Sequence, residues 1–248
     1  MAYPVYENSG NLTTSITVTI GIEYPSSISA DDILIIVAAK DGSYGSGNAT
    51  APSGFTFLQG SDGSGDDFQT VIYWKRASGS ESGSENLVWD NTPSSVTAGI
   101  MYRYSGCITT GDPYYDVNSS LSLGVLLSNA TIPAVNSGGY QRIVMSYVIV
   151  KRYTTIATAS DYTHATYDYT TVGVDITIKS QYQQVPTASS VPSDASSLGT
   201  GSYYASHALS LQPAIINWLH NFLGIDNANI EEISGEPLTN IQSVSSIE

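Results

Sequence analysis

The chain is poor in charge, and most of the charge that it has is negative. Only 12% of its 248 residues are charged, and 22 acids stand against 8 bases, which gives a formal net charge of −14. No Lys or Arg follows Lys179. Nucleic acids and anionic membranes bind proteins through clustered basic residues, so the composition predicts neither as a partner.

Cysteine and long apolar runs are also scarce. Cys107 is the only cysteine, so an internal disulfide is excluded, and its place after a strand-like run favours a buried, inert thiol. The longest apolar run, Ile33–Ala39, is much shorter than the roughly 20 residues of a membrane-spanning helix. The first ten residues show neither a basic start nor an apolar core, which predicts no secretory signal. We expect that a leader has been removed or that the protein leaves its cell by lysis, as virion proteins do.

Strand patterns fill most of the chain. The stretch Phe68–Gly106 holds two alternating runs, Thr70–Trp74 and Val96–Tyr104, which predict strands with one face on a core and the other in water. Asp31–Ala39 is almost entirely apolar and predicts a strand buried on both faces. Leu12–Ile22 alternates Ile or Val with Thr and predicts one half-buried strand.

These patterns predict an all-β fold. About ten strands without interleaved helices favour an antiparallel two-sheet β-sandwich, of jelly-roll or immunoglobulin-like type, over residues 1–212. The segments Thr154–Thr171 and Val185–Ser202 are polar and are expected to be loops, the first with an edge excursion as its alternative.

Residues 213–248 differ from the rest. Pro213–Leu223 has apolar residues near helical spacing between a Pro and a Gly, which predicts a short helix. The extended tail that follows is too sparse in apolar residues to bury itself, so we expect it to make subunit contacts. The residues predicted for this assembly role are Trp218, Phe222, Ile225, Ile230, Ile233, Leu238 and Ile241.

Catalytic motifs are missing. The sequence has no G-x-S-x-G nucleophile elbow, and His164, His207 and His220 are scattered without metal-ligand spacing. His207 stands among small residues of a strand-like run, which favours a hydrogen-bonded structural histidine. No catalytic residue is predicted, and the chain is expected not to be an enzyme.

One acidic turn is a candidate metal site. Asp62, Asp66 and Asp67 lie in the Gly-rich segment Ser61–Asp67 and could offer hard oxygen ligands to Ca²⁺. The same residue types also occur in hairpin turns for backbone reasons alone. No other cofactor is predicted.

Tyrosine is abundant, with 18 residues, and several lie in predicted loops or at strand ends. Exposed aromatic rings can stack on sugars or form subunit contacts. The alternative is that they pack a half-buried strand face. The candidates for carbohydrate or partner contact are Tyr114, Tyr115, Tyr167 and Tyr169.

A series of segments carries a resemblance to a known family. In order they read DDILIIVAA, PSGFTFLQG, TVIYWKRAS, LVW, AGIMYRYSGCITTGDPYYD and YYASHALSLQP, between Asp31 and Pro213. This series resembles a β-sandwich domain that recurs in virion surface proteins of phages, as head decoration or tail components. The tail ISGEPLTNIQSVSSIE is similar to the degenerate tails of phage structural proteins.

The resemblance implies a non-enzymatic structural protein of a virus particle, either a capsid decoration or a tail component. Such a protein would assemble through its C-terminal tail and display its loops outward. Its partners would be copies of itself, other virion proteins and host glycans, at the virion surface. The alternatives are a subunit of an extracellular filament and a carbohydrate-binding module.

Overall fold

The computed structural model describes residues 3–41, 49–63, 68–93, 95–122, 126–138, 141–169, 176–186 and 190–214, with the short strands at 232–233 and 236–237. The chain divides into two units, Met1–Ala214 and Ile215–Glu248. Every element in the described part is a β-strand and every pairing between strands is antiparallel, which confirms the predicted all-β class. Within these residues, no helix has the length and apolarity needed to cross a bilayer.

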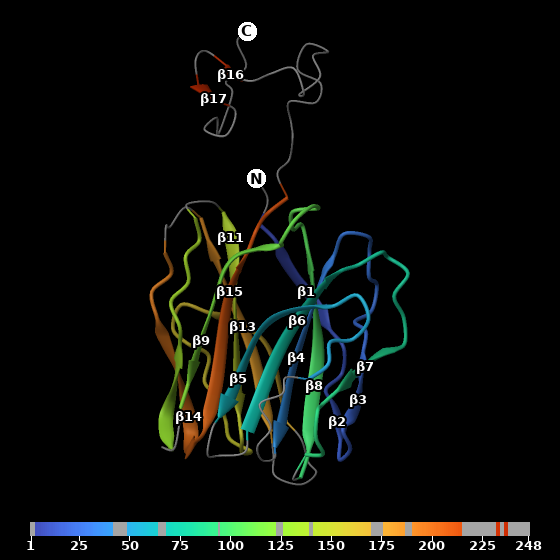
Figure 1. Cartoon of the computed structure of the whole chain (residues 1–248). Coiled ribbons are helices and arrows are strands. Elements are labelled where there is room, and N and C mark those ends of the chain that lie inside the picture. The colour runs from blue at the N-terminus through green and yellow to red at the C-terminus, as the bar shows by residue number, and fades with distance from the viewer. Residues whose placement is uncertain are drawn as a thin grey trace. The chain divides into compact units, whose positions relative to one another are not determined.

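The first unit holds fifteen strands in the described part, more than the ten expected (Figure 1). In chain order they are β1 (Val5–Ser9), β2 (Thr13–Ser15), β3 (Thr19–Glu23), β4 (Ile33–Asp41), β5 (Thr56–Gly63), β6 (Phe68–Arg76), β7 (Ser84–Val88), β8 (Thr97–Ser105), β9 (Tyr114–Leu121), β10 (Leu127–Ile132), β11 (Arg142–Val150), β12 (Thr163–Tyr169), β13 (Thr177–Val185), β14 (Asp194–Ser202) and β15 (Tyr204–Leu211). In the second unit, β16 (Glu232–Ile233) pairs with β17 (Glu236–Pro237).

Two large sheets form the body of the first unit. Sheet I has the order β1-β8-β4-β6-β5, with β2 also paired to β8. Sheet II has the order β12-β13-β11-β15-β9. The central strands are β4 in sheet I and β11 in sheet II. Each of them is buried along its whole length.

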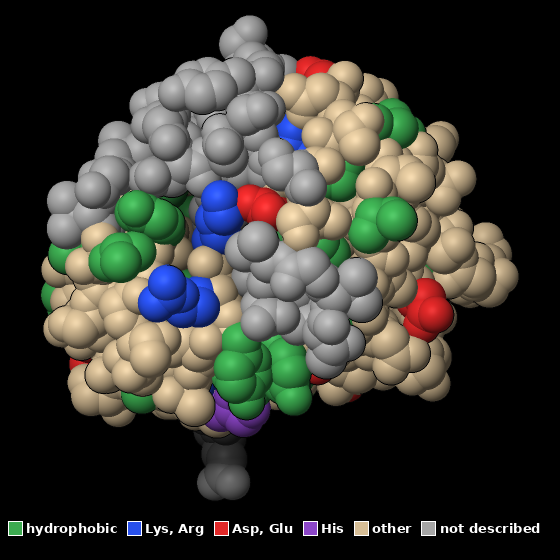
Figure 2. Space-filling model, turned by 90° about the horizontal axis from the view of Figure 1, so that it is seen from below, with side chains coloured by type: hydrophobic (Ala, Val, Ile, Leu, Met, Phe, Trp, Pro, Cys, Tyr) green, Lys and Arg blue, Asp and Glu red, His purple; other side chains and the backbone are tan. Residues whose placement is uncertain are grey.

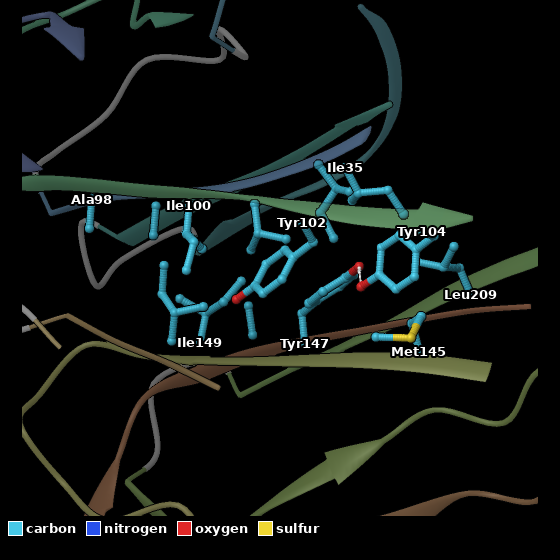
Figure 3. Packing of buried hydrophobic residues seen from close by; sticks show 14 of the residues in the cluster. Ile35, Ala98, Ile100, Tyr102, Tyr104, Met145, Tyr147, Ile149 and Leu209 are labelled. Atoms are coloured by element: carbon cyan, nitrogen blue, oxygen red, sulfur yellow. Dashed lines mark hydrogen bonds between the residues drawn. The ribbon is translucent and has the colours of Figure 1, made fainter. Parts of the chain in front are cut away.

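The two sheets face each other across one apolar core (Figure 3). Alternate residues of the central strands point into it, such as Ile35 of β4, Ile100 of β8 and Ile149 of β11. Two tyrosines meet there, and the hydroxyl groups of Tyr104 and Tyr147 lie 2.8 Å apart in a hydrogen bond that joins the sheets. Burial raises the pKa of both phenols well above the ordinary value, so both stay protonated.

The outer faces of the large sheets are covered as well, which corrects the expectation that one face of the runs Thr70–Trp74 and Val96–Tyr104 meets water. The small sheet β3–β7 covers sheet I, where Ile20 and Ile22 pack with Val71 and Tyr73. A glycine makes room for this layer, because a Cβ at Gly99 would come within 2.8 Å of Ile22 Cδ1. The small sheet β10–β14 covers sheet II in the same way, with Ile132 and Leu198 packed on Val148 among others. Both faces of β6 are therefore buried. Ile72 packs in the core between the large sheets, and Val71 packs beneath the small sheet β3–β7.

The prediction of a single strand over Leu12–Ile22 is wrong. The chain bends at residues 16–18, so β2 pairs with β8 in sheet I while β3 pairs with β7 in the layer above. At the bend, Ile16 is 65% exposed although the period-two pattern places it inside. The chain has to bend here to pass from sheet I to the small sheet above it. The alternation of residues in the sequence does not predict this bend.

Two predicted loops also contain strands. Thr163–Tyr169 is the edge strand β12 of sheet II, in line with the edge excursion, and Asp194–Ser202 is β14. The predicted boundary between residues 212 and 213 falls in a described region, where Pro213 bridges to Cys107. The predicted helix beyond Ala214 lies outside the described residues.

The hydrogen bond between Tyr104 and Tyr147 can be tested with a double-mutant cycle. Tyr104→Phe leaves the Tyr147 hydroxyl buried without its partner, and we expect the free energy of unfolding to fall by about 1–3 kcal/mol. Tyr147→Phe should cost a similar amount. The double variant removes both hydroxyls and should lose clearly less than the sum of the two losses, as measured by urea denaturation. Strictly additive losses would show that the two groups do not stabilise each other.

Candidate functional site

The first unit has two distinct ends. At one end, which we call the distal end, β4 finishes at Asp41 and β11 finishes before Lys151, and the two side chains form a salt bridge of 2.7 Å. At the opposite, proximal end, the chain leaves the body after β15, where the Ala214 amide donates to the Gly106 carbonyl at 2.8 Å. Figure 2 looks onto the distal end and shows hydrophobic and basic side chains exposed there.

The four predicted contact tyrosines divide between these ends. Tyr114 and Tyr115 are neighbours on β9 at the proximal end and point to opposite faces. Tyr114 packs on the core between the sheets, edge-on to Trp74 with ring centroids 6.4 Å apart. Tyr115 is 49% exposed and lies 4.5 Å from the guanidinium of Arg142. Tyr114 is half-buried, so Tyr115 is the more exposed of the two rings.

Tyr167 and Tyr169 lie at the distal end and meet a third ring that the sequence reading missed. Tyr153 and Tyr169 pack edge to face with centroids 4.6 Å apart, and Tyr167 lies 6.3 Å from Tyr169. Tyr153 is 50% exposed and Tyr169 is 42% exposed. We call these three residues the distal tyrosine cluster. The available signal was the position of Tyr153 directly after a strong strand, since loops at strand ends commonly carry binding residues.

The backbone beneath this cluster is held in place. The Tyr167 hydroxyl donates to the Thr154 carbonyl at 2.7 Å, and the Thr200 amide donates to Thr154 Oγ1 at 2.9 Å. The Gly199 amide donates to the Thr155 carbonyl at 2.9 Å. A Cβ at Gly199 would clash with Thr155 Oγ1, so the Thr155 side chain would have to move to admit a larger residue. The cluster is thus preorganised by β14 and β12 together.

All eight basic residues of the chain are engaged within the molecule. Lys151 and Arg103 form salt bridges with Asp41 and Asp32, the second at 2.6 Å. The partners of the others are carbonyl groups, side chains or aromatic rings, for Lys40, Lys75, Arg76, Arg142, Arg152 and Lys179. Each of these cations therefore has at least one partner within the molecule.

The buried His207 joins the two large sheets through hydrogen bonds. His207 of β15 is fully buried, with Nε2 2.9 Å from Thr70 Oγ1 of β6 and Nδ1 3.2 Å from the side-chain amide of Gln59 in β5. The Gln59 amide fits its surroundings when its nitrogen donates to Nδ1 and to the Asn118 carbonyl. His207 then donates from Nε2. Burial lowers the pKa of His207 to about 3, so it is neutral at pH 7.

Most of the candidate calcium turn, Ser61–Asp67, lies outside the described residues. Asp66 and Asp67 are not among the described residues, and of Asp62 only the backbone is placed, paired with Gln69. Within the described ranges, no group of three or more His, Cys, Asp or Glu side chains is arranged to hold a metal ion. Of the predicted assembly residues, only the backbone of Ile233 is described, in β16. Trp218, Phe222, Ile225, Ile230, Leu238 and Ile241 lie outside the described residues.

The neutral state of His207 predicts a dependence of stability on pH. Its pKa is about 3 in the folded protein and 6.5 when unperturbed, so between these values the unfolded chain binds one more proton. The contribution is fully present above pH 6.5 and is lost as the pH falls, by about 1.4 kcal/mol per pH unit. Between pH 7.5 and pH 5.0, His207→Gln should lose about 2 kcal/mol less of its unfolding free energy than the wild type.

The exposed histidine supplies the control for that experiment. His164 is exposed, and partial burial and the charge of Lys179 also lower its pKa, so the stability of His164→Gln should follow the pH profile of the wild type more closely than that of His207→Gln does. Urea titrations at both pH values measure the effect. Parallel pH profiles for the wild type and His207→Gln would contradict the burial of a neutral imidazole.

Comparison with known proteins gives no further guide to this site. No protein-family model, no curated protein and no solved structure matches the chain. A function for the chain therefore has to be argued from its own residues, chiefly the anchored tyrosines at the distal end and the engaged cations.

Proposed function

We propose that the chain is a non-enzymatic structural protein of a virus particle, a capsid decoration or tail component that displays its distal loops outward. The observation that carries this proposal is the polarity of the body. The chain leaves the first unit at the proximal end, held at Ala214 by Gly106, while the exposed tyrosine cluster lies at the opposite end. A body with this polarity can be attached at one end and present the other.

The use of buried polar groups supports a structural role. His207 links the sheets, and Lys179 donates to the Ile156 carbonyl at 2.7 Å and to Thr158 Oγ1 at 2.8 Å. Burial raises the pKa of the Cys107 thiol to about 12, so it is a poor nucleophile at neutral pH. Each of these groups has a packing role that accounts for its presence, which favours a scaffold over a catalyst.

Charge supports partners that are proteins rather than nucleic acids or anionic membranes. With a net charge of −14, the chain would be repelled by polyanions. The sequence resemblance to virion surface domains also favours proteins as partners. The assembly contacts would then come from the apolar residues of the tail, in a homo-oligomer or with other virion proteins.

The filament alternative receives less support. A filament built by strand exchange needs a terminal strand that pairs only with another subunit. Here β1 pairs with β8 of the same chain from Val5 to Ser9. The first described strand is therefore already used within its own sheet.

Removal of the tail tests the proposal. The full chain should sediment as an oligomer, and deletion of Ile225–Glu248 should give a monomer that keeps the β-type circular dichroism of the body. A length-matched variant keeps the tail but replaces Ile225, Ile230, Ile233, Leu238 and Ile241 with Ser. It should also be monomeric, because the apolar side chains are expected to make the contacts. An oligomer of unchanged size in both variants would sink the proposed mode of assembly.

A further inference from the structure

We propose that the distal tyrosine cluster, Tyr153, Tyr167 and Tyr169, is a binding site for a neutral oligosaccharide. The inference deepens the proposed function, on which it rests, since a display subunit would use this end to attach to a glycan-covered surface. Three observations support it: the geometry of the rings, the polar groups around them and the net negative charge of the chain.

The rings are presented in a form that suits a sugar. Tyr153 and Tyr169 are half exposed and meet at an interplanar angle of 61°, so they make a corner rather than a flat patch. The electron-rich face of an aromatic ring attracts the C–H groups on the face of a pyranose. One ring can therefore stack on a sugar while the other bounds its edge.

Contacts within the body hold the backbone beside this corner in place. Tyr167 packs against the core beneath β10–β14 and its hydroxyl is bound to the Thr154 carbonyl. Tyr153 follows β11 on a segment that Thr177 Oγ1 holds by a 2.8 Å bond to the Arg152 carbonyl. Tyrosine loses little conformational entropy on binding, and a fixed backbone reduces that loss further.

The polar groups beside the rings include the hydroxyls of two threonines. Thr155 and Thr200 are both exposed beside Thr154. The Thr155 hydroxyl can donate to or accept from a sugar hydroxyl, and Thr200 Oγ1, which donates to Thr154 Oγ1 at 3.1 Å, can accept. Arg152, which precedes Tyr153 in the sequence, is exposed and donates to the Gly201 carbonyl at 3.2 Å. With the net charge of −14, this environment selects against sialylated or sulfated glycans and favours neutral ones.

The size of the surface favours a sugar over a protein. Half of a tyrosine side chain offers about 100 Å², so the two exposed rings together offer about 200 Å². A stable protein interface buries about 800 Å² on each partner. A site of this area suits one or two sugar rings.

Binding to an array of neutral oligosaccharides tests the proposal. The array carries glucose, galactose, mannose and N-acetylhexosamine chains, with sialylated and sulfated chains beside them. The full-length protein should bind at least one neutral glycan, and titration calorimetry with that glycan should show a loss of at least tenfold in affinity for Tyr153→Ala and for Tyr169→Ala. Tyr153→Phe keeps the ring and should keep most of the affinity.

Tyr115→Ala is the matched control, because Tyr115 is similarly exposed but lies at the proximal end. Its glycan affinity should equal that of the wild type. The substitutions at exposed rings should leave the melting temperature nearly unchanged. Three results would each overturn the proposal: no neutral glycan is bound, only anionic glycans are bound, or the Tyr153→Ala/Tyr169→Ala double variant binds as the wild type does.

The outcome is separable from that of the assembly experiment. The tyrosine variants should form the same oligomer as the wild type, and the protein without Ile225–Glu248 should keep its intrinsic affinity for the glycan in calorimetry. If the protein assembles normally but binds no glycan, the proposed glycan site is wrong and the proposed structural role stands. Normal glycan binding without any oligomer would remove the structural role and leave a binding module.

Discussion

Burial of the central strands on both faces is the constraint on which the rest of the structure depends. Because β4, β8, β11 and β15 are nearly free of solvent contact, the two large sheets need a core between them and a small sheet over each outer face. The hydrogen bond between Tyr104 and Tyr147 joins the large sheets within that core. A buried hydroxyl is costly without a partner, so this pair also fixes how the sheets face each other.

The same burial decides what the polar residues do. Groups that could serve chemistry in an open site, such as His207, Lys179 and Cys107, lie inside these layers and are used for contacts within the molecule. Recognition therefore has to use side chains that lie at the surface. The distal tyrosine cluster is the part of that surface where exposed rings, hydroxyl groups and a fixed backbone come together.

Local patterns predicted the strand class well but not the layers. The apolar run in Asp31–Ala39 predicted double burial, and β4 has it. In β6, Val71 and Tyr73 alternate with Ile72 and Trp74, so both faces are apolar and the pattern alone does not say which face would be wet. The strand β14 was read as a loop because its Ser, Thr and Gly residues have low β-propensity, and pairing with β10 overrides that preference. The contact between Tyr153 and Tyr169 depends on the sheet order β12-β13-β11, which periodicity does not contain.

The central claim is that the body is attached at its proximal end and presents its distal end. The most direct measurement is an electron cryomicroscopy reconstruction of the assembled object, with the neighbours of each copy identified. The account predicts that neighbouring chains contact the proximal end and the residues after Ala214, while Tyr153 and Tyr169 face solvent. Neighbouring chains packed over the distal tyrosine cluster, with the proximal end free, would contradict it.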